Sequence, residues 1–119
     1  VDLYPTIVDH AGHKVPQVLE GVSLVSLLND PLADWDKPAI SQVIHSRGEA
    51  YGFSLRTDRW RYTEWKRGEA GRELYDHAND PDEVTNLAGY PEHAALVKRL
   101  SEQLKPFVDT MSNASVLAN

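Results

Sequence analysis

The sequence contains no cysteine, which excludes disulfide bridges, thiolate metal sites and a cysteine nucleophile. It also lacks any apolar run near the ~20 residues that a membrane-spanning helix needs. Hydrophobic residues at 41% and charged residues at 25% are typical of a folded chain rather than a disordered one. We expect one domain, or part of one, and the opening Val-Asp-Leu-Tyr-Pro without methionine reads as the interior of a longer polypeptide.

Acidic residues predominate and give a net charge of −6, which disfavours nucleic acid and anionic membranes as partners. Residues 47–72 are the exception, because seven basic side chains there face four acidic ones. One interpretation is that this basic segment contacts an anionic ligand or an acidic neighbour. The other is that its arginines lie on the solvent-facing side of a sheet.

Apolar spacing predicts helices near both ends of the chain. A helix is expected over 2–11, with Asp2 as its N-cap and Pro5 in its first turn, and a short helical turn over 24–28. A longer helix is expected to begin at residue 91 and to carry an apolar stripe as far as Met111. Pro106 should kink or weaken it, and residues 112–119 are predicted to form a flexible tail.

The central segment alternates with the period of β-strands. Strands are expected over 39–44, 51–57 and 59–65, with a short further strand over 73–76. Because the period is two, Trp60 and Tyr62 share a face, and the simplest interpretation places them in a core against the last helix. The predicted fold class is α+β, with a small antiparallel sheet of three to four strands packed against a C-terminal helix.

Polar residues after the last strand have two alternative interpretations. Asp80 could cap a helix that starts at Pro81, with Glu83 completing a capping box. The same acidic cluster could hold a divalent cation, but it lacks the ligand spacing and glycine of a calcium loop, so cap and turn chemistry is favoured. His10 and His13 are three residues apart, but the intervening Gly12 makes a metal site there a weaker interpretation. No nucleophile motif of a known hydrolase type is present.

Three motifs, in this order along the chain, resemble the C-terminal region of sulfatases of the alkaline-phosphatase superfamily. They are Asp2-Leu3-Tyr4-Pro5-Thr6 with Leu19-Glu20-Gly21-Val22-Ser23-Leu24, the segment 52–65, and Glu73-Leu74-Tyr75-Asp76 with Asp80-Pro81, Glu83 and Asn86-Leu87. The middle motif looks most like that of iduronate-type sulfatases. The resemblance covers residues 1–108, nearly the whole chain.

The resemblance implies a two-part parent enzyme. A large α/β domain would carry a formylglycine nucleophile, made in a Cys/Ser-x-Pro-x-Arg motif, and a calcium ion, while a smaller C-terminal subdomain would carry a four-stranded sheet and a helix. In that frame, residues 1–30 end the catalytic domain, 38–111 form the C-terminal subdomain and 112–119 are a tail. The chain has no cysteine and no Ser-x-Pro-x-Arg, so we expect a non-catalytic piece with no metal site.

The resemblance also implies partners and site residues. The parent would hydrolyse sulfate esters of sugars, with uronates as the expected substrates, in an exported or lysosomal compartment. The piece would contribute structure and one wall of the substrate cleft. Gln42, His45 and Arg47 are the predicted cleft-facing group, since an arginine suits a carboxylate or sulfate, although Arg47 could equally be an exposed loop cation. Arg56 is predicted to be a structural ion-pair partner, to Asp58 or to a carboxylate of the missing domain.

Two other functions remain open at this point. The chain could be an independent module that binds acidic glycans through its basic hairpin, which salt-sensitive retention on heparin would reveal. It could also be a self-sufficient metal hydrolase, which the missing nucleophile and ligands disfavour. If the chain is a detached piece, the apolar face of its first helix lacks its parent domain, and we expect it to dimerise or to pack on a neighbour.

Overall fold

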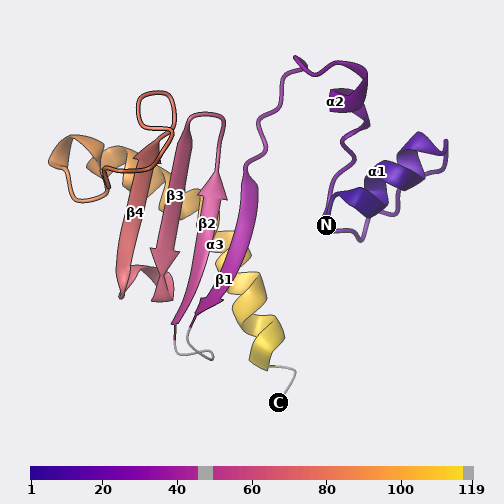
Figure 1. Ribbon diagram of the computed structural model, residues 1–119. Coiled ribbons are helices and arrows are strands. Elements are labelled where there is room, and N and C mark those ends of the chain that lie inside the picture. Colours follow the sequence, from indigo (N-terminus) through magenta and orange to yellow (C-terminus); the bar gives the residue numbers. More distant parts are fainter. Residues whose placement is uncertain (46–49, 117–119) are drawn as a thin grey trace. The chain divides into compact units, whose positions relative to one another are not determined.

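The computed structural model describes residues 1–45 and 50–116; of residues 45, 50 and 111–116 it describes the backbone only. The chain divides into two compact units, residues 1–35 and 36–119 (Figure 1). Each unit is described by itself below. No helix in the described part of the chain is long and apolar enough to cross a membrane.

The first unit contains two helices, α1 (Leu3–His10) and α2 (Val25–Asn29). Asp2 is the N-cap residue of α1, as predicted, but its side chain makes no cap bond and instead accepts a hydrogen bond from the Val22 backbone N–H at 2.8 Å. Thr6 adds a second link between the helices, since its hydroxyl accepts a hydrogen bond from Leu24 N–H at 3.0 Å. These bonds connect residues about 20 positions apart, a relationship that helix-capping rules do not contain.

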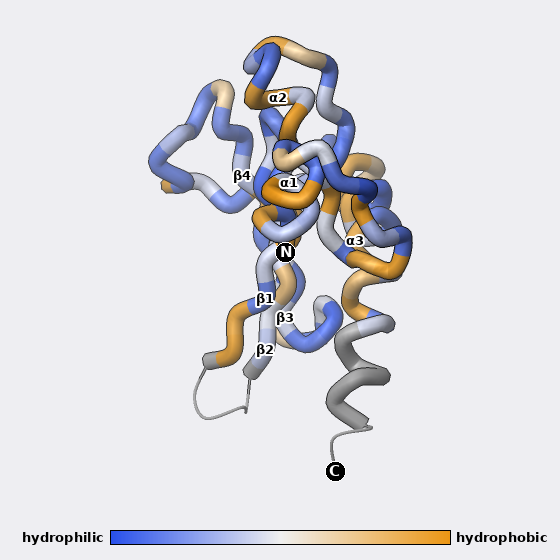
Figure 2. The backbone as a smooth tube through the Cα atoms, turned by 90° about the vertical axis from the view of Figure 1, so that its right-hand side faces the viewer, coloured by the Kyte–Doolittle hydropathy of each residue, from blue (hydrophilic) through white to orange (hydrophobic). Residues whose placement is uncertain are grey.

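Hydrophobic residues recur along α1 (Figure 2). Several of them remain largely exposed. Leu3 is 75% exposed and Ile7 is 66% exposed, although they lie four residues apart on one side of the helix. The apolar spacing that predicted this helix therefore does not correspond to a core within the first unit.

The second unit contains a four-stranded antiparallel sheet in the order β1-β2-β3-β4 (Figure 1). Its strands are β1 (Ala39–His45), β2 (Ala50–Arg56), β3 (Trp60–Trp65) and β4 (Gly71–Asp76). Short connections between strands that are adjacent in sequence make this meander the simplest antiparallel arrangement. The predicted α+β fold class is confirmed.

The predicted hairpin is also confirmed. Arg56 pairs with Arg61 across its closed end, and the Thr57 N–H donates to Trp60 O at 2.9 Å. The Thr57 hydroxyl accepts a hydrogen bond from the Trp60 N–H at 2.9 Å, and this bond stabilises the turn between β2 and β3. After β3, a short 3-10 turn (η2, Lys66–Gly68) leads into β4.

The core of the second unit lies between the sheet and the last helix. That helix, α3, spans Ala94–Val116 after a 3-10 turn (η3, Pro91–His93), so it ends five residues beyond Met111 and runs through Pro106 without a break. Its apolar stripe meets one face of strands β2 to β4. The buried core residues are Phe53, Leu55, Tyr62, Leu74, Leu100, Leu104 and Val108. Fully burying one such side chain contributes roughly 1.5–3 kcal/mol.

One carboxylate is buried within this interface. Glu64 lies two residues from Tyr62, so both point toward α3, and Glu64 is only 7% exposed. Its carboxylate accepts hydrogen bonds from the Tyr62 hydroxyl at 2.7 Å and from the Ser101 hydroxyl on α3. Burial first, and then the bond to Glu64, raise the pKa of Tyr62 well above its usual value. The tyrosine therefore stays protonated and remains a hydrogen-bond donor.

Candidate functional site

The predicted cleft-facing group lies at the end of β1. Gln42 is exposed and pairs with Phe53, which places it on the sheet face that meets α3. The His45 backbone pairs with Ala50, but the His45 side chain lies outside the described part of the structure. Arg47 lies outside the described residues. The contribution of this group to a cleft therefore stays a prediction.

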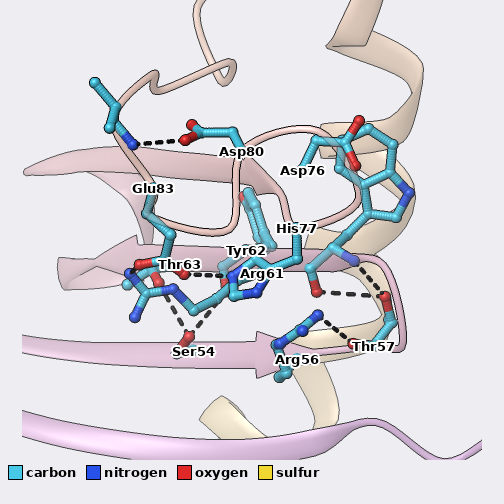
Figure 3. Close-up of polar contacts among 12 residues, drawn as sticks. Ser54, Arg56, Thr57, Arg61, Tyr62, Thr63, Asp76, His77, Asp80 and Glu83 are labelled. Carbon is cyan, nitrogen blue, oxygen red and sulfur yellow. Dashed lines mark hydrogen bonds and ion pairs between the residues drawn. The ribbon is translucent and has the colours of Figure 1, made fainter.

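Arg56 does not form the expected bond to the side chain of Asp58. Its guanidinium donates to the backbone oxygen of Thr57 at 2.6 Å (Figure 3). It also donates to the backbone oxygen of Asp58 at 3.1 Å. The arginine therefore stabilises the hairpin turn by satisfying main-chain acceptors.

The polar side chains of the sulfatase-like motif after β4 converge in three dimensions. Asp76 is buried at the end of β4 and receives a two-pronged hydrogen bond from Arg59, at 2.8 Å and 2.6 Å. It also accepts bonds from the Asn79 side chain and from the Ala78 N–H. These donors, the Arg59 guanidinium above all, hold the pKa of Asp76 well below its usual range.

Glu83 belongs to the same motif as Asp76 but has different hydrogen-bond partners. One carboxylate oxygen lies 2.5 Å from His77 Nε2, and the other pairs with the Arg61 guanidinium on β3 (Figure 3). The backbone of Glu83 has a φ of +55°, which an interior helical residue does not adopt. The predicted capping box at Asp80 and Glu83 is therefore wrong, and no helix forms between η3 and β4 in this described segment.

Asp80 organises the loop instead of starting a helix. Its two carboxylate oxygens accept the N–H groups of Val84 at 3.0 Å and Thr85 at 2.9 Å. These backbone bonds lower the pKa of Asp80, because they favour the ionised form. Asp80 therefore holds an irregular loop where the sequence predicted the start of a helix.

Asn86 closes the motif against the outer edge of β4. Its side-chain oxygen accepts the Leu74 N–H at 3.0 Å, and its side-chain nitrogen donates to Arg72 O at 3.1 Å. The adjacent Leu87 N–H then donates to Leu74 O at 2.8 Å. The amide group thus replaces a neighbouring strand along this edge, and this role was not recognised from the sequence.

The arginines of the basic segment are mostly paired with carboxylates. The pairs are Arg59–Asp76, Arg61–Glu83, Arg67–Asp109 and Arg72–Glu64, the last at 3.9 Å. Paired cations attract an external anion less strongly than free ones, because their field is largely cancelled at short range. The local excess of positive charge in the sequence therefore does not become a free basic surface on the described part of the hairpin.

The described residues contain no catalytic metal arrangement. No group of three or more His, Cys, Asp or Glu side chains within that part of the chain could hold a metal ion. Asp76, His77, Asp80 and Glu83 instead bond to arginine, to backbone amides and to one another. This arrangement can hold a loop rigidly, and nothing in it positions a nucleophile.

Comparison with known proteins identifies the chain. Residues 1–110 match the family described as N-sulphoglucosamine sulphohydrolase, C-terminal. The chain belongs to this family of sulfatase C-terminal regions. The match includes both the first unit and the sheet with α3.

Individual sulfatases agree with this assignment. Arylsulfatase K of Xenopus laevis is 34% identical over 121 residues, which cover 92% of this chain and 22% of that protein. A delta 4,5-hexuronate-2-O-sulfatase of Bacteroides thetaiotaomicron is 35% identical over 100 residues, covering 82% of this chain and 21% of that protein. A solved structure of a 2-O GAG sulfatase superposes with a TM-score of 0.76 at 31% identity, covering 99% of this chain and 26% of that one. The sulfatase C-terminal region described here thus spans about a fifth to a quarter of its relatives' length.

Each polar residue of the third motif of this sulfatase region makes a different contact, and these contacts explain the spacing of the residues along the chain. Asp76 ends β4, Asp80 shapes the loop, Glu83 reaches back to β3 and Asn86 covers β4. The residue types were visible in the sequence, but the partners on β3 and β4 were not. In this chain the motif holds the loop after β4 against the sheet.

Proposed function

We propose that this chain is the non-catalytic C-terminal part of a sulfatase that hydrolyses sulfate esters of sugars. The observation that carries the proposal is the family match over residues 1–110, together with relatives that are sulfatases four to five times as long. Sulfate-ester hydrolysis needs an activated nucleophile and a cation to neutralise developing charge. We assign both to the part of the parent that precedes the match.

The residues of this chain do not fit those two groups. The sequence has no cysteine and no Ser-x-Pro-x-Arg from which a formylglycine could be made. Within the described residues no three side chains form a metal site. The role that we propose for the chain is to stabilise the catalytic part and to form one wall of its substrate cleft.

For the substrate we propose a sulfated uronic acid, as in iduronate-type sulfatases and glycosaminoglycan degradation. Support comes from the resemblance of residues 52–65 to that group and from the 35% identity with a delta 4,5-hexuronate-2-O-sulfatase. A uronate presents a carboxylate beside its sulfate, and arginine binds either anion with two parallel hydrogen bonds. Arg47 is our candidate for that contact.

The proposal is tested in the full-length parent. The wild-type enzyme should release sulfate from a 2-O-sulfated hexuronate. An Arg47→Ala variant should raise KM by about 10-fold, the typical effect of losing one charge-assisted hydrogen bond. Arg99→Ala, on the exposed side of α3, is the matched control and should leave KM unchanged. Equal kinetics for both variants would remove Arg47 from the site, and absence of sulfate release in the wild type would remove the function.

A further inference from the structure

We propose that the outer edge of β1 and the adjoining open face of the sheet dock against the catalytic part of the parent sulfatase. We call this the β1 surface; it comprises the main chain of residues 39–44 and the side chains of Val43, Ser54, Thr63 and Trp65. The inference rests on the proposed function and specifies which face of the C-terminal region meets its partner.

The two edges of the sheet differ in whether other residues cover their main-chain N–H and C=O groups. The β4 edge is covered by Asn86 and Leu87, which bond to Arg72 and Leu74. Within the second unit the β1 edge has no such cover, because the main chain of residues 39–44 forms hydrogen bonds there only with β2. An uncovered strand of this length presents a row of unpaired N–H and C=O groups, which proteins normally pair, block or charge.

The side chains of β1 do not protect this edge. The sequence Ala39–His45 contains no lysine, proline, aspartate or glutamate, the residues that commonly prevent edge pairing. Val43 is 49% exposed and Ile44 is 66% exposed. An apolar, uncharged edge is typical of a strand that is buried against further polypeptide.

The open face next to Val43 is hollowed. The hollow has a volume of about 210 Å³ and is lined by Val43, Gly52, Ser54, Arg61, Thr63, Trp65 and Glu73. Gly52 allows the Trp65 ring to lie against the strand, because a Cβ at that position would be 2.8 Å from the ring. Small or flat side chains make up most of the lining, so the hollow can admit a close contact with another surface.

Most polar groups of the hollow are already satisfied. Trp65 Nε1 donates to Glu73 at 2.8 Å, and the Thr63 hydroxyl donates to that of Ser54 at 3.1 Å. Burying groups that already have partners costs little. The exception is Arg61 Nε, a buried nitrogen with no hydrogen-bond partner in the described part of the chain. A docked segment that supplies one acceptor, such as a carbonyl oxygen, would satisfy it.

The charge balance favours polypeptide over an acidic sugar as the occupant. Arg61, the cation that lines the hollow, is paired with Glu83, and Glu73 adds a negative charge to the same lining, so the side chains of the hollow carry no excess of positive charge. The catalytic part of the parent is the occupant that the relatives make available, since this chain spans only 22% of arylsulfatase K. Its docking would cover the edge and the hollow together.

Hydrogen exchange on the full-length parent tests the β1 surface. Peptides covering 39–44 should exchange slowly, within about 10-fold of peptides from the central strand β3, and independently of protein concentration. In Val43→Lys, which inserts a charge into the surface, exchange of the 39–44 peptides should accelerate by about 10-fold or more. Val84→Lys, the same change at a loop valine that is 82% exposed, is the matched control and should leave the exchange unaltered.

Other occupants of this surface give different results. Protection of 39–44 that disappears on dilution would identify a second copy of the chain, and protection that requires added heparin oligosaccharide would identify a glycan; either would overturn the proposal. Rapid exchange of 39–44 in the wild type, or equal exchange in the two lysine variants, would also overturn it. Sulfate release by the wild-type parent is measured separately, so loss of the interface and loss of the proposed function are distinguishable.

Discussion

Single residues in the segment 76–86 derive their roles from partners that are distant in the sequence. Glu83 bonds to Arg61, which is 22 positions away, and Asp76 bonds to Arg59, which is 17 positions away. Asn86 takes the place of a strand by offering one donor and one acceptor in the geometry of a peptide group. A side chain that satisfies backbone groups in this way cannot be replaced by a residue of similar size without leaving those groups unpaired.

Asn86→Leu should therefore destabilise the second unit by about 1–3 kcal/mol, the usual cost of leaving partly buried polar groups unsatisfied. Chemical denaturation of the chain, followed by tryptophan fluorescence, measures this change. Gln103→Leu, on the exposed side of α3, is the control and should change stability little. Equal effects of the two variants would show that Asn86 does not cover the β4 edge in solution.

Asp76 should make the fold sensitive to acid. Because Arg59 and the other donors hold its folded pKa below the value of about 3.9 in an unfolded chain, ionised Asp76 stabilises the fold above that pH. This contribution is lost as the pH falls below about 4 and toward the folded pKa. Asp76→Asn should flatten the decline in melting temperature between about pH 5 and pH 2.

The control for the acid prediction is Asp82→Asn, an exposed aspartate in the same loop. It should leave the pH dependence of the melting temperature close to that of the wild type. A wild-type melting temperature that is constant over this range would contradict the role of Asp76.

At the scale of elements, the sheet and α3 depend on each other. Each presents one apolar face, and neither could bury that face alone. Leu100, Leu104 and Val108 recur at intervals of four along α3 and lie on one side of it. The buried Glu64 joins the two layers through Tyr62 and Ser101 and so adds a polar link to this apolar contact.

Leu104→Ala tests this dependence at a side chain that is 0% exposed. It should destabilise the second unit by about 2–5 kcal/mol, because the substitution removes buried area and leaves a cavity. The measurement is again chemical denaturation. Leu32→Ala, at a side chain that is 94% exposed, should have little effect, and equal losses for both would contradict the core assigned to α3.

Strand and helix positions were largely predictable at this scale, and the exceptions have physical causes. Alternation identified β1 to β4 and placed Tyr62 in the core, because burying one face of a strand imposes a period of two. The local pattern around Asp80 favoured a helix, but the partners offered by β3 and the backbone of the loop were stronger. Local rules fail where a distant group competes for the same side chain.

At the scale of the whole molecule, the distribution of charge bears on the functions that the sequence left open. A module for acidic glycans needs a free basic surface, whereas four arginines of the basic segment 47–72 have carboxylate partners. The chain also carries a net charge of −6, which repels polyanions at long range. These observations favour a structural part of a sulfatase over an independent glycan-binding module.

The chain should accordingly elute from a heparin column at low salt, below the ~0.15 M of physiological conditions. Glu83→Gln, which removes the charge that neutralises Arg61, should increase retention relative to the wild type. Strong retention of the wild type that falls as salt rises would instead support the glycan-binding module.

The sequence by itself determined the family, the order of the elements and the face of each strand that enters the core. All three follow from local periodicity and from motifs that are read along the chain. Only the tertiary structure decided the roles of Asp76, Glu83 and Asn86, the cover on the β4 edge, and the pairing of four arginines of the segment 47–72 with carboxylates. Those features depend on which distant groups meet when the strands align, because a hydrogen bond or ion pair forms only where folding brings its two partners within reach.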